Sequence, residues 1–114
     1  MTDCVFCKIV RGEIPCAKVY EDDDILAFDD IHPMAPVHVI IIPKRHIATL
    51  MDLDATKEEL PARFWAAAQK IAEIKKVSAR GFRTVINCNA EGGQVVFHLH
   101  MHLLGGRNLE DTLG

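Results

Sequence analysis

The feature that most constrains the fold is an alternating run near the C-terminal end, His98-Leu99-His100-Met101-His102-Leu103. Side chains of a β-strand alternate between its two faces, so the run predicts a strand with imidazoles on one face and apolar side chains on the other. The apolar face must cover a core. Neighbouring imidazoles repel one another when protonated, and neutral imidazole can act as a nucleophile, a general acid or a metal ligand. The pattern therefore favours chemistry on an anionic group such as phosphate over a plain surface strand.

The remaining patterns predict an α+β fold. Five apolar residues recur at helical spacing and predict a main helix that begins near Pro61 and ends before Gly81: Leu60, Phe64, Ala67, Ile71 and Ile74. A short N-terminal helix is expected around Phe6, Ile9 and Val10. Apolar runs bounded by turn residues predict strands at 17–20, 25–28, 37–42, 83–88 and 95–104. We therefore expect an antiparallel sheet of about five strands with one main helix and one short helix.

Length and composition are those of one ordinary globular domain spanning residues 1–114, with 49% hydrophobic and 25% charged residues. The net charge of -3 offers no basic surface for DNA or RNA. The longest apolar run, at 39–42, is too short for a membrane span, and the N-terminus lacks the pattern of a signal peptide. A cytoplasmic protein without nucleic-acid or membrane partners is expected.

Several motifs together make the chain similar to the histidine triad (HIT) superfamily of nucleotide hydrolases and transferases. They are Phe6-x-x-Ile9, Gly12-Glu13-Ile14-Pro15, Ala27-Phe28-x-Asp30-Ile31-x-Pro33-x-Ala35-Pro36-x-His38, Ile42-Pro43-Lys44-x-His46-Ile47, and Asn87 with Gly92-Gly93-Gln94 before the three histidines. The triad followed by Leu103-Leu104-Gly105-Gly106-Arg107 resembles the Hint branch of purine nucleoside phosphoramidases more than the dinucleoside polyphosphate hydrolases. The resemblance implies a HIT-like fold.

The resemblance also implies a role for each histidine of the triad. His100 would be the nucleophile that attacks the α-phosphorus and forms a nucleotidyl-histidine intermediate, from which water releases AMP or GMP. His102 would contact the phosphate, and His98 would orient the neighbouring imidazole. His38 is expected to act as a supporting hydrogen-bonding residue, whereas His32 lies in a turn.

The nucleotide-binding residues follow from the same resemblance. Asp30 would accept hydrogen bonds from the ribose hydroxyls. The purine would lie among apolar side chains that could equally be core residues, namely Phe6, Ile9, Phe28 and Ile31. Phosphate oxygens would be held by Asn87, Gln94 and the backbone at Gly93 and Val95. Hint relatives often carry a hydroxyl residue at the position of Val95, so here only the backbone N–H can contribute.

A second constellation is the Cys4-x-x-Cys7 pair, which can supply two thiolates from one turn. HIT proteins with this pair resemble zinc binders that also use the positions of His46 and His98, which implies one structural zinc per chain. The alternatives are two reduced cysteines on a short helix and, less favoured, a thioredoxin-like redox pair, which should follow a strand. The other two cysteines are expected only to pack.

The implied activity is hydrolysis of the P–N bond of purine nucleoside 5′-phosphoramidates, with acyl- or aminoacyl-adenylates as further candidate substrates. Two alternatives remain open: a dinucleoside polyphosphate hydrolase, and a zinc-stabilised nucleotide-binding regulatory dimer with little turnover. The resemblance implies a homodimer in which the main helix and the edge strand pair across a two-fold axis. Phe64, Trp65 and residues 66–68 agree with this, because they give the helix more apolar surface than one face needs.

Overall fold

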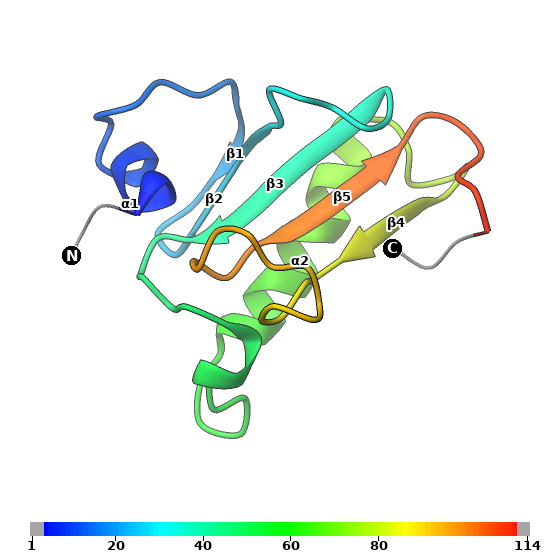
Figure 1. Ribbon diagram of the computed structural model, residues 1–114. Coiled ribbons are helices and arrows are strands. Elements are labelled where there is room, and N and C mark those ends of the chain that lie inside the picture. Colours follow the sequence, from blue (N-terminus) through cyan, green and yellow to red (C-terminus); the bar gives the residue numbers. More distant parts are fainter. Residues whose placement is uncertain (1–3, 112–114) are drawn as a thin grey trace.

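The computed structural model describes residues 4–111. In chain order its elements are α1 (Val5–Val10), β1 (Lys18–Glu21), β2 (Ile25–Asp29), β3 (Val37–Pro43), the 3-10 turn η1 (Leu50–Asp52), α2 (Leu60–Ile74), β4 (Phe82–Val85) and β5 (Met101–Gly105). The strands form one antiparallel sheet in the order β1-β2-β3-β5-β4, and Figure 1 shows α2 lying across one face of it. The predicted α+β class and five-stranded antiparallel sheet are confirmed.

The central strands are buried on both faces because a helix covers each face. Alternate residues of β2 and β3 point in opposite directions. Ala27 and Ile41 pack with the buried side of α2, whereas Phe28 and Ile40 pack with Phe6 of α1. Burial on both sides explains why these strands are continuous apolar runs in the sequence, and it brings the short α1 into contact with the sheet.

The β4 end of the sheet is less well covered, because α2 contacts β1, β2 and β3. Thr84 of β4 pairs with Leu103, which belongs to the core beneath α2, so Phe82 and Thr84 face the same side as that core. On this side Phe82 is 38% exposed and Trp65 of α2 is 71% exposed. An apolar surface therefore lies open beside an edge strand.

The main helix starts where it was predicted, near Pro61, but its predicted end is wrong. It ends at Ile74 instead of continuing to Gly81, because Lys76 adopts a left-handed φ of 62° and the N–H of Val77 closes the turn. Among the helices described, none has the length and apolar character needed to cross a membrane.

The last two strands are shorter than their patterns predict, whereas the first three agree to within one residue at each end. β4 stops at Val85, and in the following loop Asn87 donates its side-chain amide to the carbonyl of Gly92. β5 begins only at Met101, so His98 and His100 precede the regular ladder. The nucleophile predicted for this chain is thus held by contacts other than strand pairing.

Candidate active site and metal cluster

The three histidines of the triad lie close together but have different partners. His98 is fully buried, His100 is 8% exposed, and the rings of His100 and His102 lie 5.1 Å apart between centroids. The ring of Phe6 meets both His98 and His100 edge to face, with centroid distances of 5.8 and 5.2 Å. Phe6 thus packs against the rings of His98 and His100, and the hydrogen bonds of each histidine determine which nitrogen carries the proton.

His100 is held by the backbone of its own triad. Its Nδ1 lies 2.7 Å from the carbonyl oxygen of His98. A carbonyl can only accept a hydrogen bond, so Nδ1 carries the proton and donates it. In the neutral ring the lone pair is then on Nε2, which makes this nitrogen available as a nucleophile.

His102 is held by a chain of hydrogen bonds that begins in the β2–β3 loop. The backbone N–H of Met34 donates to Nδ1 of His38 at 3.0 Å, so His38 carries its proton on Nε2. That Nε2 lies 2.9 Å from Nδ1 of His102 and donates to it. A neutral His102 therefore carries its proton on Nε2, where it can donate to an anionic ligand.

The imidazoles of His102, His38 and His98 favour the neutral form. Burial, together with the neighbouring His100 and His38, lowers the pKa of His102 to about 4, while Asp30 opposes the shift. Burial also lowers the pKa of His38, again against Asp30, and the pKa of His98, against its hydrogen bond to Pro43. Around neutral pH these three rings therefore keep the tautomers that their backbone partners select.

The loop before the triad is braced from within. Gln94 is buried, and its side chain accepts from the N–H of Asn89 and donates to the carbonyls of Ala48 and Val96. The N–H of Gly93 donates to the carbonyl of Ala90. Three of the four groups expected to hold phosphate, those of Asn87, Gly93 and Gln94, thus also hold the loop in shape.

The residues expected around the purine fall into two groups. Phe6 and Phe28 are buried and meet edge to face at 5.8 Å, and Ile9 packs on the same cluster. Ile31, in contrast, is 85% exposed. The buried aromatic pair thus lies beside His100, with which Phe6 is in edge-to-face contact, whereas Ile31 is an exposed residue of the β2–β3 loop.

Asp30 borders this site from the end of β2. Its side chain accepts the backbone N–H of His32 at 2.7 Å, and its other oxygen lies 3.4 Å from Nε2 of His38. A cleft of about 360 Å³ opens beside His38 and His102, and Asn87 also lines it. Asp30, His38 and His102 therefore lie together, and the cleft beside the two imidazoles also reaches Asn87.

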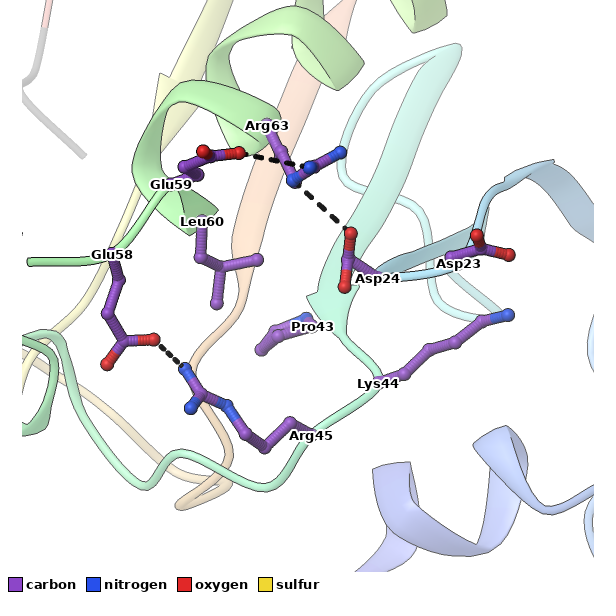
Figure 2. Close-up of a pocket in the computed structure, with 9 residues that line it drawn as sticks. All are labelled: Asp23, Asp24, Pro43, Lys44, Arg45, Glu58, Glu59, Leu60 and Arg63. Atoms are coloured by element: carbon purple, nitrogen blue, oxygen red, sulfur yellow. Dashed lines mark hydrogen bonds and ion pairs between the residues drawn. The ribbon is translucent and has the colours of Figure 1, made fainter.

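A slightly larger cavity of about 400 Å³ lies at the start of α2, away from the triad (Figure 2). Its charged side chains are paired with one another: Arg45 with Glu58, and Arg63 with both Asp24 and Glu59. No histidine or cysteine lines it. Its ion pairs join α2 to the β1–β2 turn and to the segment after β3, so we assign it a structural role.

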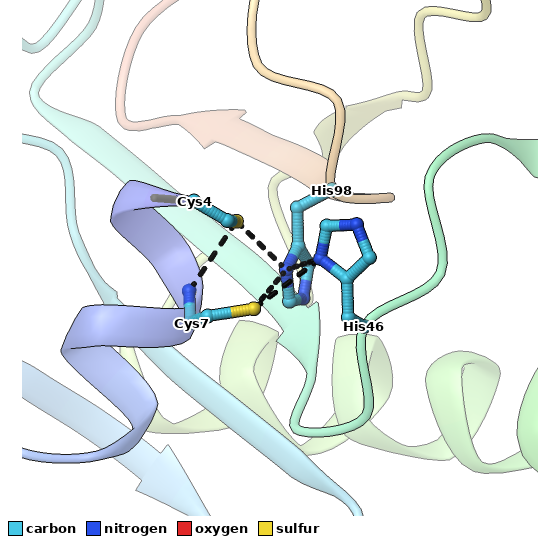
Figure 3. A group of neighbouring side chains, drawn as sticks. All are labelled: Cys4, Cys7, His46 and His98. Carbon is cyan, nitrogen blue, oxygen red and sulfur yellow. Dashed lines mark hydrogen bonds between the residues drawn. The ribbon is translucent and has the colours of Figure 1, made fainter. Parts of the chain in front are cut away.

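The Cys4-x-x-Cys7 pair lies next to two histidines, His46 and His98 (Figure 3). Nδ1 of His98 lies 3.3 Å from Sγ of Cys4, 3.6 Å from Sγ of Cys7 and 3.3 Å from Nδ1 of His46, and the four ligand atoms all lie within 4.8 Å of one another. Zinc–nitrogen and zinc–sulfur bonds of about 2.0 and 2.3 Å give tetrahedral edges of roughly 3.3–3.8 Å. The four residues could therefore bind a metal ion.

The protonation of His98 agrees with a ligand role. Its Nε2 lies 2.8 Å from the carbonyl oxygen of Pro43 and must donate to it, so the lone pair of a neutral ring is on Nδ1, the atom that faces the cluster. Asp30, His38 and His102 form a second group of potential ligands within 4.8 Å. There the hydrogen bond between His38 and His102 already accounts for the short distance.

Comparison with known proteins agrees with this geometry. The HIT domain family matches residues 11–109. The chain is 48% identical over 111 residues to the purine nucleoside phosphoramidase of Escherichia coli K12, and these aligned residues cover 97% of this chain and 93% of that protein. The chain belongs to the HIT family. A HIT family hydrolase from Legionella pneumophila shares 50% identity at a TM-score of 0.93, covering 98% of this chain and all (100%) of that chain. A histidine triad protein from Clostridium difficile shares 43% identity at a TM-score of 0.94, with coverage of 99% and 98%.

The structure thus brings the residues expected in this HIT protein into two adjoining groups. The four expected metal ligands form one group. In the other group His102 and Asn87 line the cleft, and His100 lies next to His102. Asp30 lies next to His38, and Val95 is 87% exposed. Sequence reasoning gave His38 only a supporting role and missed its pairing with His102. The alternation along residues 37–42 was the available signal, since it places His38 on the same face as Ile40.

Proposed function

We propose that this HIT protein is a purine nucleoside phosphoramidase that cleaves the P–N bond through a nucleotidyl-His100 intermediate. The observation that carries the proposal is the tautomer of His100, whose Nδ1–H is bound by the carbonyl of His98. Its Nε2 lone pair is available next to His102, whose Nε2–H can donate to phosphate. Identity with the Escherichia coli phosphoramidase supports the choice of substrate.

The reaction proceeds in two displacements at phosphorus. Nε2 of His100 attacks the α-phosphorus, the P–N bond breaks, and its electron pair leaves with the amine, which takes a proton from water. His102 donates its Nε2–H to a phosphoryl oxygen, and the backbone N–H of Val95, at the mouth of the braced loop, donates to another. The hydroxide left by that proton transfer then attacks the same phosphorus, and the P–Nε2 bond breaks with its electron pair returning to His100, which releases the nucleoside monophosphate and restores the neutral ring.

The nucleoside is held beside this centre. The carboxylate of Asp30 accepts from the ribose hydroxyls, for which its rim position is suited. The purine lies against Phe6, Ile9, Phe28 and Ile31. The shape of the loop that contains Asn87, Gly93 and Gln94 keeps the phosphate in place.

The deciding test compares the wild type with His100→Ala on adenosine 5′-phosphoramidate, with His32→Ala as the matched control because His32 is an exposed turn residue. We expect His100→Ala to abolish turnover and His32→Ala to retain it. A wild type without activity, or activity that survives in His100→Ala, would refute the proposal. Much faster turnover of diadenosine polyphosphates would favour a dinucleoside polyphosphate hydrolase, and tight AMP binding without turnover a regulatory dimer.

Zinc is the metal that we propose for the cysteine–histidine cluster, because a Cys2His2 set at tetrahedral spacing is typical of structural zinc sites. When bound, zinc would tie α1 to the sheet through Cys4, Cys7, His46 and His98. Elemental analysis of protein purified without added metal should find close to one zinc per chain. The Cys4→Ser, Cys7→Ser double variant should lose it, whereas Cys16→Ser should keep it.

A homodimer is proposed for the open side of the sheet. β4 is an edge strand, and edge strands present unpaired backbone groups to other chains. Phe82 and Trp65 are exposed on the α2 side of the sheet, where a second copy could cover them. Sedimentation should give a dimer for the wild type and a monomer for a Trp65→Glu, Phe82→Glu variant. Met51→Glu, at a residue that is 74% exposed on η1, should remain dimeric.

A further inference from the structure

The segment that carries the nucleophile is not held by the sheet. Regular pairing with β3 stops at Met101, which lies opposite Ile41. Just before that point, the N–H of Leu99 donates to the carbonyl of Ile47 at 2.6 Å, and the buried side chain of His98 anchors the segment. The orientation of His100 therefore depends on how firmly His98 is held.

His98 makes three connections, and each uses a different group. Its Nε2–H donates to Pro43, its Nδ1 faces the sulfur atoms of Cys4 and Cys7 and the ring of His46, and its carbonyl accepts the Nδ1–H of His100. A displacement of the His98 ring would move the carbonyl that selects the tautomer of His100. His98 thus joins the metal cluster to the nucleophile.

The short helix α1 gives a second connection. Its six residues are too few to form a stable isolated helix, so contacts with the rest of the protein must hold it in place. Cys4 caps this helix and Cys7 lies within it. Between them lies Phe6, whose ring meets both His98 and His100. The residues that would share the metal therefore also hold an aromatic ring against the nucleophile.

We propose that Cys4, Cys7 and His46 are positioning residues for catalysis, so that metal occupancy of their cluster with His98 sets the orientation of His100 and the affinity for a purine nucleotide. The effect on catalysis rests on the proposed function, in which His100 is the nucleophile. Loss of a residue that orients a ligand or a reacting group typically lowers activity by about 10- to 100-fold. We expect a loss in kcat of that size without metal. By linkage, AMP should raise metal affinity by the same factor by which metal raises AMP affinity, about 5-fold or more.

His46 offers the sharpest variants because it is exposed and its side chain contacts Cys7 and His98 of the cluster. His46→Ala removes one ligand, and His46→Cys replaces it with another. His46→Ala should lose the metal and about 10- to 100-fold in kcat while keeping the far-ultraviolet circular dichroism of the wild type. His46→Cys should recover both metal and most of kcat. His32→Ala serves as the matched control and should change neither.

A cobalt(II) form provides a readout that does not depend on turnover. We expect AMP to shift the thiolate-to-cobalt absorption of the wild type and to tighten cobalt binding. A folded metal-free His46→Ala protein with the kcat and AMP affinity of the wild type overturns the inference, as does a cobalt spectrum and affinity that AMP leaves unchanged. If His46→Ala does not fold, the cobalt measurements decide alone. If the wild type cleaves no phosphoramidate, the proposed function fails, and the coupling of AMP to cobalt still tests this one.

Discussion

Replacing His38 by asparagine or by glutamine separates the two hydrogen bonds that this residue makes. Asparagine places an oxygen near the position of Nδ1 and can still accept the N–H of Met34, but it cannot reach His102. Glutamine places an amide N–H near the position of Nε2 and can still donate to His102. His38→Asn therefore removes the support of His102, whereas His38→Gln preserves it.

The size of the effect follows from the geometry. The donor–acceptor distance between His38 and His102 is 2.9 Å, and His38 is 6% exposed, so solvent cannot readily replace the lost donor. An unsatisfied buried polar group costs about 1–3 kcal/mol. If this cost falls on the transition state, it corresponds to a reduction in kcat of about 5- to 150-fold for His38→Asn. His38→Gln should stay within about 5-fold of the wild type.

The assay is steady-state hydrolysis of adenosine 5′-phosphoramidate, with melting temperature as a control for folding and nitrogen-15 imidazole spectra to report the tautomer of His102. Both variants lose the ring of His38, so a purely structural effect would lower both melting temperatures and both activities alike. Equal activity in His38→Asn and His38→Gln would refute the assignment of His38 as the donor that positions His102.

Three further predictions follow from the same structure. In an NMR titration His102 should show a pKa of about 4, below its ordinary value of 6.5. Between these two pH values the unfolded chain binds more protons than the folded protein, so this histidine makes the stability of the protein rise with pH, and His102→Asn should flatten that rise. Gly92→Ala should deform the loop and weaken AMP binding measured by calorimetry, because its Cβ would lie 2.4 Å from the carbonyl oxygen of Cys88. In urea denaturation, Leu103→Ala should lower the free energy of unfolding by about 2–5 kcal/mol, since Leu103 is fully buried, whereas Met51→Ala should change it by less than about 0.5 kcal/mol.

The sequence predicts the architecture well where a pattern depends only on neighbouring residues. The apolar runs that became β2 and β3 are fixed by burial on both faces, and their predicted ends agree with the structure to within one residue. The end of α2 could not be read in this way, because Lys76 adopts a conformation usually taken by glycine. The start of β5 was missed because alternation continues through His98, whereas the hydrogen bonds to β3 do not.

The same distinction applies to the site. The spacing of the triad and of the cysteine pair identifies the groups that meet, since each motif carries its chemistry in adjacent residues. The link between His38 and His102 depends on the register of β3 against β5, in which Ile40 lies opposite His102. The internal bonds of Gln94 depend on a loop fold that no local pattern specifies. Residue identity could therefore be predicted, but the direction of each hydrogen bond could not.

The direction of these hydrogen bonds, from donor to acceptor, explains why burying several histidines together is compatible with catalysis. Backbone groups determine the tautomers: the carbonyl of Pro43 for His98, the carbonyl of His98 for His100, and the N–H of Met34, through His38, for His102. A second proton on His100 would remove the lone pair that attacks phosphorus, and one on His98 would remove the lone pair that faces the metal cluster. Burial, which lowers the pKa of His98 and of His102, disfavours such protonation in both. The desolvation that makes His98 and His102 costly to bury thus also keeps these two rings neutral.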